Sequence, residues 1–266
     1  MSYPINHKIE HTKISIGAKR NDIRKLCSEA LKHQFRSVVV FPEWCHYAKE
    51  RLEGTGIKVV QIFLFPNQPS PNRSQWADET DVYVDFRYCD SWRIKFGLNR
   101  KLAMIQAVCG DKPIKVVIET NLLTDKEITI ASRLVKKFKF DYIKSSTGLF
   151  ERVRKHQDEL RIIQRAIVTP VLAFTLKSVK PFDKINVSTP NLKLSKFLFK
   201  LKGLKVTLPY LRIANPKIKI SGGIGTRQIV DDLIRMGVDL VGTSHSAEIM
   251  EGTNEKEKPK QIEVRK

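Results

Sequence analysis

The sequence has few cysteines, and their spacing suggests neither a disulfide framework nor a metal site. The four are Cys27, Cys45, Cys89 and Cys109, and no two of them form a C-x-x-C pair. None stands at a zinc-site spacing from a histidine, and the six histidines are scattered along the chain. We therefore expect buried thiols in a reducing compartment and predict no metal.

Long hydrophobic runs are also missing. No stretch approaches the roughly 20 apolar residues that a membrane-spanning helix needs. The first residues, MSYPINHKIEHTK, lack the apolar centre of a signal peptide. A cytoplasmic protein is the expectation.

Acidic residues are scarce relative to basic ones. The chain has 48 Lys and Arg against 28 Asp and Glu, a formal net charge of +20. Half of this excess lies between Phe150 and Pro216, where 14 basic residues face 4 acidic ones. Such a balance suits nucleic acid, an anionic membrane or phosphorylated metabolites, and equally a lysine-rich surface.

Short apolar runs alternate with helical patterns along the chain. Several runs are apolar nearly throughout, as expected for parallel strands covered on both faces. The predicted strands are Ile9–Ile14, Ser37–Phe41, Lys58–Phe65, Asp81–Phe86, Ile114–Thr120, Asp141–Ser146, Lys217–Ser221 and Leu240–Ser244.

The intervening helices are amphipathic. Asn21–His33 begins with polar capping residues, and Thr124–Phe138 begins with TDKE, a capping box. Eight strands with helices between them predict an α/β fold, a (β/α)8 TIM barrel. A doubly wound open sheet is the alternative, although no G-x-G-x-x-G follows the first strand.

Two intervals depart from this alternation. Prolines and polar residues make the crossover at residues 66–80 too irregular for a full helix. The interval after Phe150 starts helically, at Glu151–Ile167, and then carries a long basic insertion at about 168–216. We expect one barrel domain over residues 1–250, followed by a flexible charged tail at 251–266.

Candidate chemistry lies at the carboxyl ends of the strands, where barrel enzymes place reacting groups. Because side chains alternate along a strand, inward faces would carry Lys144 on the sixth strand, Lys219 on the seventh and Asp81 on the fourth. Asp85 shares the face of Asp81. Two lysines would then meet beside a carboxylate.

Two lysines beside a carboxylate are suited to a specific reaction. A free lysine is almost fully protonated at neutral pH and cannot attack a carbonyl. Burial and a second ammonium group lower the pKa of the amine and free its lone pair. Lys144 would form a Schiff base, Lys219 would lower its pKa and relay protons, and Asp81 would donate and accept protons.

Glycine-rich turns follow the last two predicted strands. SGGIG, residues 221–225, follows the seventh strand, and GTSH, residues 242–245, ends the eighth. Barrel enzymes commonly bind phosphate with backbone N–H groups of these two loops, and glycine permits close approach. The pair predicts a phosphate site.

Several of these segments resemble the deoxyribose-phosphate aldolases, which are class I, Schiff-base aldolases. DYIKSSTG is similar to the family's Schiff-base segment, KISGGI to the segment with its second lysine, and ADETDV to the segment with its catalytic aspartate. HTKI, KVVIETNLLTDKEI and GVDLVGTS resemble other strands of the family. The resemblance covers most of the chain from Ile9 to about Ile249, apart from the insertion.

The resemblance implies reversible cleavage of 2-deoxy-D-ribose 5-phosphate to D-glyceraldehyde 3-phosphate and acetaldehyde, in deoxyribonucleotide catabolism, without a metal or organic cofactor. It assigns the Schiff base to Lys144, with Lys219 and Asp81 beside it. It places Gly148, Gly222, Gly223 and Ser244 around the substrate phosphate, and it implies a homodimer or higher homo-oligomer.

The sequence also departs from the family pattern. Asp85 stands where a small or polar residue is usual, and a second inward acid would raise the pKa of Asp81. His245 replaces a second serine, and Glu10 stands where aspartate is expected. The tail carries no tyrosine for a proton relay.

Two other functions stay open at this stage. One is a catalytically silent barrel that binds nucleic acid or an anionic membrane through its basic insertion. The other is a Schiff-base aldolase acting on a different sugar phosphate.

Overall fold

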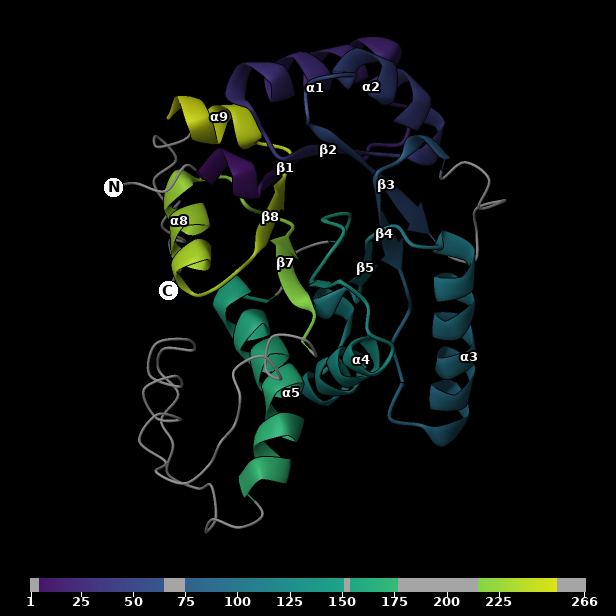
Figure 1. Ribbon diagram of the computed structural model, residues 1–266. Coiled ribbons are helices and arrows are strands. Elements are labelled where there is room, and N and C mark those ends of the chain that lie inside the picture. The colour runs from purple at the N-terminus through teal and green to yellow at the C-terminus, as the bar shows by residue number, and fades with distance from the viewer. Residues whose placement is uncertain (1–4, 65–74, 151–153, 177–214, 253–266) are drawn as a thin grey trace, which may run out of the picture.

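The computed structural model describes residues 5–64, 75–150, 154–176 and 215–252, apart from the side chains of Leu64 and of residues 168–176. Eight parallel strands close into a barrel in the order β1 to β8, and helices surround it (Figure 1). The closed barrel is confirmed, and the open-sheet alternative was wrong. The strands are β1 (Ile9–Lys13), β2 (Ser37–Val40), β3 (Lys58–Leu64), β4 (Glu79–Tyr83), β5 (Ile114–Val117), β6 (Tyr142–Lys144), β7 (Lys217–Ser221) and β8 (Leu240–Thr243).

The α-helices are α1 (Arg20–His33), α2 (Cys45–Leu52), α3 (Trp92–Cys109), α4 (Asp125–Lys137), α5 (His156–Leu176), α8 (Arg227–Arg235) and α9 (Ser246–Glu251). The predicted capping box of α4 is present. The Thr124 side chain accepts from the backbone N–H of Glu127, whose carboxylate accepts from the Thr124 N–H at 2.8 Å. No helix within the described ranges is long and apolar enough to cross a membrane.

The fourth strand begins two residues before its predicted start. Glu79 pairs in register with Val60 of β3, so Glu79 and Thr80 belong to the sheet and not to the preceding crossover. Acidic residues are depleted in strands, which is why the sequence pattern placed this boundary later. Ion pairs to Glu79 inside the barrel override that preference.

Other boundaries differ at the ends of segments. Helix α5 continues to Leu176, so the first residues of the predicted insertion extend this helix. The remainder of the insertion, most of the irregular crossover and nearly all of the tail lie outside the described residues, so those predictions stay untested.

The barrel interior divides into an apolar part and a charged part. Inward residues from β1 to β3 and the loops after them form a buried apolar cluster, which consists of Ile14, Val39, Phe41, Val60 and Ile62. Charged side chains gather on the inward faces of β4 to β7 and at Glu10 of β1. A large second cluster lies between the strands and the helices. The strands therefore hold the buried charges inside a rigid, apolar shell.

Candidate functional site

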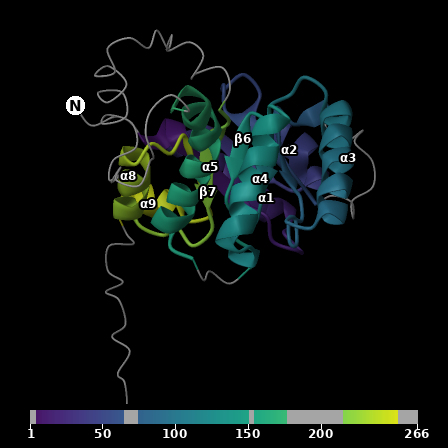
Figure 2. The same ribbon diagram turned by 90° about the horizontal axis from the view of Figure 1, so that it is seen from below.

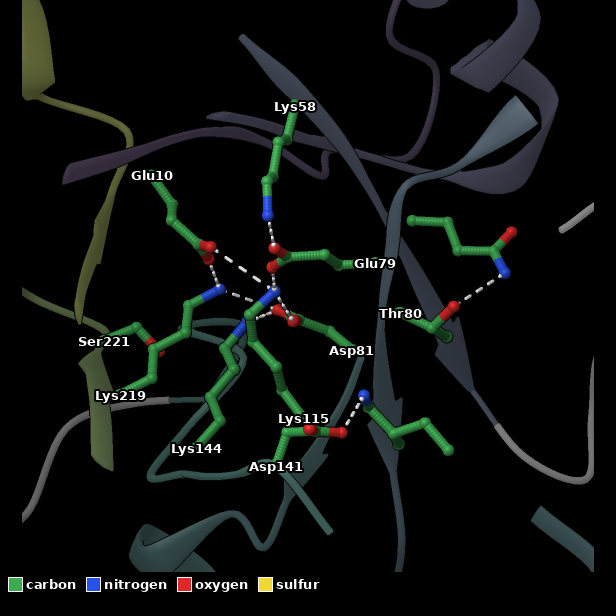
Figure 3. Close-up of polar contacts among 12 residues, drawn as sticks. Glu10, Lys58, Glu79, Thr80, Asp81, Lys115, Asp141, Lys144, Lys219 and Ser221 are labelled. Carbon is green, nitrogen blue, oxygen red and sulfur yellow. Dashed lines mark hydrogen bonds and ion pairs between the residues drawn. The ribbon is translucent and has the colours of Figure 1, made fainter. Parts of the chain in front are cut away.

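Two lysines from neighbouring strands converge on one carboxylate inside the barrel. Lys144 Nζ of β6 and Lys219 Nζ of β7 each donate to Asp81 Oδ2 of β4, both at 2.8 Å (Figure 3). All three side chains are fully or almost fully buried. The predicted juxtaposition of Lys144, Lys219 and Asp81 is therefore present, on the strands where the sequence placed them.

This environment changes the proton affinity of Lys144. Burial lowers its pKa to about 8, and the positive charge of Lys219 acts in the same direction, against the attraction of Asp81. Burial alone would raise the pKa of Asp81, but the charges of Lys144 and Lys219 outweigh it and hold that pKa below its ordinary range. The carboxylate is therefore ionised, and Lys144 loses its proton more easily than an ordinary lysine.

A third buried lysine, Lys115 of β5, contacts the same carboxylate from the other side. Its Nζ lies 2.5 Å from Glu79, 3.3 Å from Glu10 and 3.5 Å from Asp81. Burial works to lower its pKa, but the charges of Glu10, Asp81 and Glu79 prevail and raise it. Lys115 therefore stays an ammonium ion and acts as a fixed positive charge.

Two glutamates complete the network. Glu10 of β1 pairs with Lys219 through one oxygen and with Arg36 Nη1 at 2.6 Å through the other. Glu79 binds Arg36 Nη2 at 2.6 Å and Lys58 Nζ at 2.8 Å, besides Lys115. Positively and negatively charged groups thus alternate across the barrel interior, so each buried charge lies next to a group of opposite charge.

Sequence reasoning missed most of this network. It named Glu10 only as a difference from the family pattern, and it did not identify Lys115, Glu79 or Arg36. For Lys115 the signal was partial: alternation puts it on the same face of β5 as Val117, but only the register with Asp81 shows that this face points inward. For Arg36 there was none, because it precedes β2 and reaches its partners only through the closed barrel.

The loop after β6 packs against the loop after β7, and a glycine of each loop forms the contact. A Cβ on Gly148 would lie 3.3 Å from Cα of Gly222, and both residues have positive φ, at +81° and +89°. Gly223 also has a positive φ, and Ser244 is exposed after β8. The structure brings Gly148 and Gly222 together, while the role of these four residues in phosphate binding stays a prediction.

Glu119, which follows β5, anchors the loop after β6. It is buried with φ of +53°, and its carboxylate accepts from the Thr147 backbone N–H at 2.9 Å and from Thr147 Oγ1 at 2.8 Å. It also accepts from Ser146 Oγ, which in turn accepts from the Gly148 N–H at 2.9 Å. The position of Gly148 therefore depends on Glu119.

Replacing Glu119 with alanine is expected to loosen this loop. The donors of Ser146 and Thr147 would lose their acceptor, which costs about 1–3 kcal/mol of unfolding free energy. Chemical denaturation would measure the loss. The control is Glu43→Ala, which changes a glutamate outside the core and should leave stability within about 0.5 kcal/mol. Equal stabilities of the two variants would contradict the anchoring role.

Two of the residues that differ from the family pattern, Asp85 and His245, have other surroundings than the buried lysine pair. The carboxylate of Asp85 is held by Arg87, with Nη2 to Oδ2 at 2.7 Å, and this pairing lowers the pKa of Asp85. His245 is exposed next to Ser244. The expected effect of a second inward acid is absent from Asp81, whose pKa is lowered rather than raised.

Metal ligands do not gather in the described ranges. No group of three or more His, Cys, Asp or Glu side chains there could hold a metal ion. The buried carboxylates are already engaged by lysine and arginine.

Several known proteins that are similar in sequence to this chain are deoxyribose-phosphate aldolases. The chain is 34% identical over 173 residues to a deoxyribose-phosphate aldolase of Streptococcus mutans, covering 61% of this chain and 78% of that protein. It is 30% identical over 188 residues to a deoxyribose-phosphate aldolase of Metamycoplasma arthritidis, covering 67% and 86%. No protein-family model matches the chain.

Solved structures agree on the fold. The tetrameric deoxyribose phosphate aldolase of Aeropyrum pernix superposes with a TM-score of 0.62 at 19% identity, over 95% of this chain and 93% of that one. At this identity the likeness concerns the barrel alone.

Proposed function

Because the chain belongs to the deoxyribose-phosphate aldolase family, we propose that it is a class I aldolase that cleaves 2-deoxy-D-ribose 5-phosphate reversibly to D-glyceraldehyde 3-phosphate and acetaldehyde. The observation that carries this proposal is the pair of buried lysine amines on one oxygen of Asp81. Such a pair serves to make one amine nucleophilic at neutral pH.

Lys144 is the nucleophile among the three buried lysines. Its pKa is lowered to about 8, whereas that of Lys115 is raised. At pH 7 roughly a tenth of Lys144 is therefore in the neutral form that attacks a carbonyl. Lys115 stays protonated between three carboxylates and cannot attack.

The reaction begins when Lys144 Nζ adds to the C1 aldehyde of the open-chain sugar. Loss of water gives a protonated imine, which withdraws electrons from C2. Removal of the proton from the C3 hydroxyl then breaks the C2–C3 bond, releases the aldehyde of glyceraldehyde 3-phosphate and leaves an enamine on Lys144. Protonation at C2 and hydrolysis release acetaldehyde and restore the amine. Since the imine is the electron sink, the chemistry needs no metal or organic cofactor.

Asp81 and Lys219 move the protons in these steps. Asp81 is ionised and accepts hydrogen bonds from both amines, so it can take a proton from one and return it to water or substrate. Lys219 supplies the positive charge that favours a neutral Lys144. Glu10 and Lys115 hold Lys219 and Asp81 in place through ion pairs.

The substrate phosphate lies against the loops after β6, β7 and β8 in this proposal. Gly148, Gly222 and Gly223 have the positive φ that favours glycine, and Gly148 and Gly223 are exposed to solvent. The exposed hydroxyl of Ser244 completes the set. This arrangement favours a sugar phosphate as substrate.

Borohydride trapping tests the proposal. Reduction in the presence of 2-deoxy-D-ribose 5-phosphate is expected to attach the reduced substrate or product carbon skeleton to the peptide that contains Lys144, and peptide mass analysis would locate it. A panel of aldehydes and sugar phosphates would separate this substrate from a rival sugar phosphate. No adduct with any of them, or an adduct on Lys219 or Lys115, would contradict the assignment.

A further inference from the structure

The loop after β7 contains a peptide bond between two glycines, Gly222 and Gly223. Both residues have positive φ, +89° and +66°, and Gly223 is exposed. Because neither residue has a Cβ atom, this peptide can rotate at little steric cost. The glycines alone therefore do not decide which way the N–H of the peptide points, and another contact has to fix it.

The residues on either side of this peptide are held by the neighbouring strands. The backbone N–H of Ser221 donates to Ser145 Oγ at 3.1 Å, and Ser221 Oγ donates to the carbonyl oxygen of Ser146. On the other side, Thr243 Oγ1 donates to the carbonyl oxygen of Ile224 at 2.5 Å. The two glycines therefore connect two points of the backbone that are fixed independently.

His156, the first residue of α5, contacts the glycine peptide itself. Its Nε2 lies 2.8 Å from the carbonyl oxygen of Gly222, and α5 runs beside β7 in both ribbon views (Figures 1 and 2). A carbonyl oxygen can only accept a hydrogen bond, so His156 carries a proton on Nε2 and donates it. Among the residues that the structure describes, no other side chain forms a hydrogen bond with this peptide.

Holding the carbonyl of Gly222 also sets the direction of the Gly223 N–H. The two groups belong to one planar, trans peptide unit and point in opposite directions. The N–H of Gly223 therefore points away from His156, and no described residue accepts a hydrogen bond from it. A backbone N–H without a protein acceptor, on an exposed glycine, is suited to donate to an anion.

We propose that His156 is a positioning residue for the substrate phosphate: by holding the Gly222 carbonyl, it keeps the Gly223 N–H directed at the phosphate. This inference rests on the proposed function, because it concerns the phosphate of that same substrate. His156 acts through the backbone and not on the reacting carbon atoms. Its loss should therefore weaken binding of phosphorylated sugars and leave the chemistry at Lys144 in place.

Replacing His156 with leucine tests the proposal. Leucine fills space but cannot donate, so the glycine peptide would adopt other orientations and only part of the population would present its N–H to the phosphate. The KM for 2-deoxy-D-ribose 5-phosphate and the Kd for inorganic phosphate are both expected to rise about three- to tenfold, the effect of one hydrogen bond. The kcat should change less than about twofold. Steady-state kinetics and isothermal titration calorimetry on the full chain would measure these values.

A comparison of two sugars separates positioning from general damage. The preference for 2-deoxy-D-ribose 5-phosphate over 2-deoxy-D-ribose, as a ratio of kcat/KM values, should fall about three- to tenfold in His156→Leu, since only the first sugar carries the phosphate. His156→Gln should restore most of this preference. The amide Nε2 of glutamine is as many bonds from Cα as the imidazole Nε2, and it can donate to the same carbonyl.

Gln164→Leu is the matched control. Gln164 lies about two turns further along α5, and its Nε2 donates to the carbonyl oxygen of Met236 at 3.0 Å, at the end of α8. This variant loses a hydrogen bond of the same kind, so its stability should fall as that of His156→Leu does. Its KM and its preference for the phosphorylated sugar should keep the wild-type values.

The outcomes distinguish this inference from the proposed reaction. Equal changes in His156→Leu and Gln164→Leu, or a His156→Leu variant with wild-type sugar preference and phosphate affinity, would overturn the role of His156, while an adduct trapped on Lys144 would still support the reaction. Conversely, the wild type could trap no adduct while His156→Leu, unlike Gln164→Leu, binds inorganic phosphate more weakly. In that case the proposed reaction fails and the role of His156 stands.

Discussion

Replacing Lys144 with methionine is expected to lower kcat/KM for cleavage of 2-deoxy-D-ribose 5-phosphate by roughly 10⁴-fold or more, the scale seen when an enzyme loses its nucleophile. Methionine keeps much of the apolar stem of lysine but has no amine, so no imine can form. A coupled assay for glyceraldehyde 3-phosphate would measure the loss.

The Lys144→Met variant should still fold. Asp81 would retain its contacts with Lys219 at 2.8 Å and Lys115 at 3.5 Å, so its buried charge stays paired. The matched control is Lys217→Met, which alters an exposed lysine at the start of β7 and should keep nearly full activity. Turnover that survives in Lys144→Met would show that the reaction does not pass through this amine.

Replacing Lys115 with methionine is expected to cost about 3–5 kcal/mol of unfolding free energy, because it removes one partner of a buried ion-pair network. Glu79, Glu10 and Asp81 would all lose a cation in a place that water does not reach. Urea denaturation would measure the difference.

Lys58→Met is the matched control for this loss. Lys58 also pairs with Glu79, at 2.8 Å, but its side chain is 46% exposed, so removing it should cost less than about 1 kcal/mol. If both variants lose a similar amount of unfolding free energy, the burial of Lys115 does not determine how much it contributes to stability.

The same Lys115→Met change is expected to move the pH dependence of catalysis. Asp81, Lys219 and Glu10 act on Lys144, whose pKa is about 8. In the wild-type protein the positive charge of Lys115 offsets part of the negative charge of Asp81 and Glu10. When Lys115 is removed, these carboxylates stabilise the protonated form of Lys144 more strongly, and the pKa of Lys144 rises. Because the neutral amine is the reactive form, the rise of kcat/KM with pH should shift to higher pH. If activity falls but the inflection of the pH profile of kcat/KM does not move, Lys115 has a structural role only.

The barrel could be predicted from local patterns. Runs such as SVVV and KVVQIFL are short and mostly apolar, which indicates buried parallel strands, and TDKE located the start of α4. The start of β4 could not be placed in this way, because Glu79 is a poor strand former whose ion pairs come from Arg36 and Lys115, far away in the chain.

The lysine pair could also be predicted, together with Asp81. The period of two along a strand and the meeting of strand ends in a barrel placed the three side chains near one another. The same reasoning did not identify Lys115 as part of the site, since a lysine in a strand reads equally well as a solvated one. Its burial between three carboxylates follows only from the register of β5 between β4 and β6.

By itself, the sequence determined that this chain forms eight parallel strands and which inward positions carry Lys144, Lys219 and Asp81, because hydrophobic period and side-chain alternation are local properties. Only the tertiary structure decided which lysine loses its proton easily. That depends on the distances to Asp81, Glu10 and the other two lysines and on the exclusion of water, and these quantities exist only once the barrel has closed.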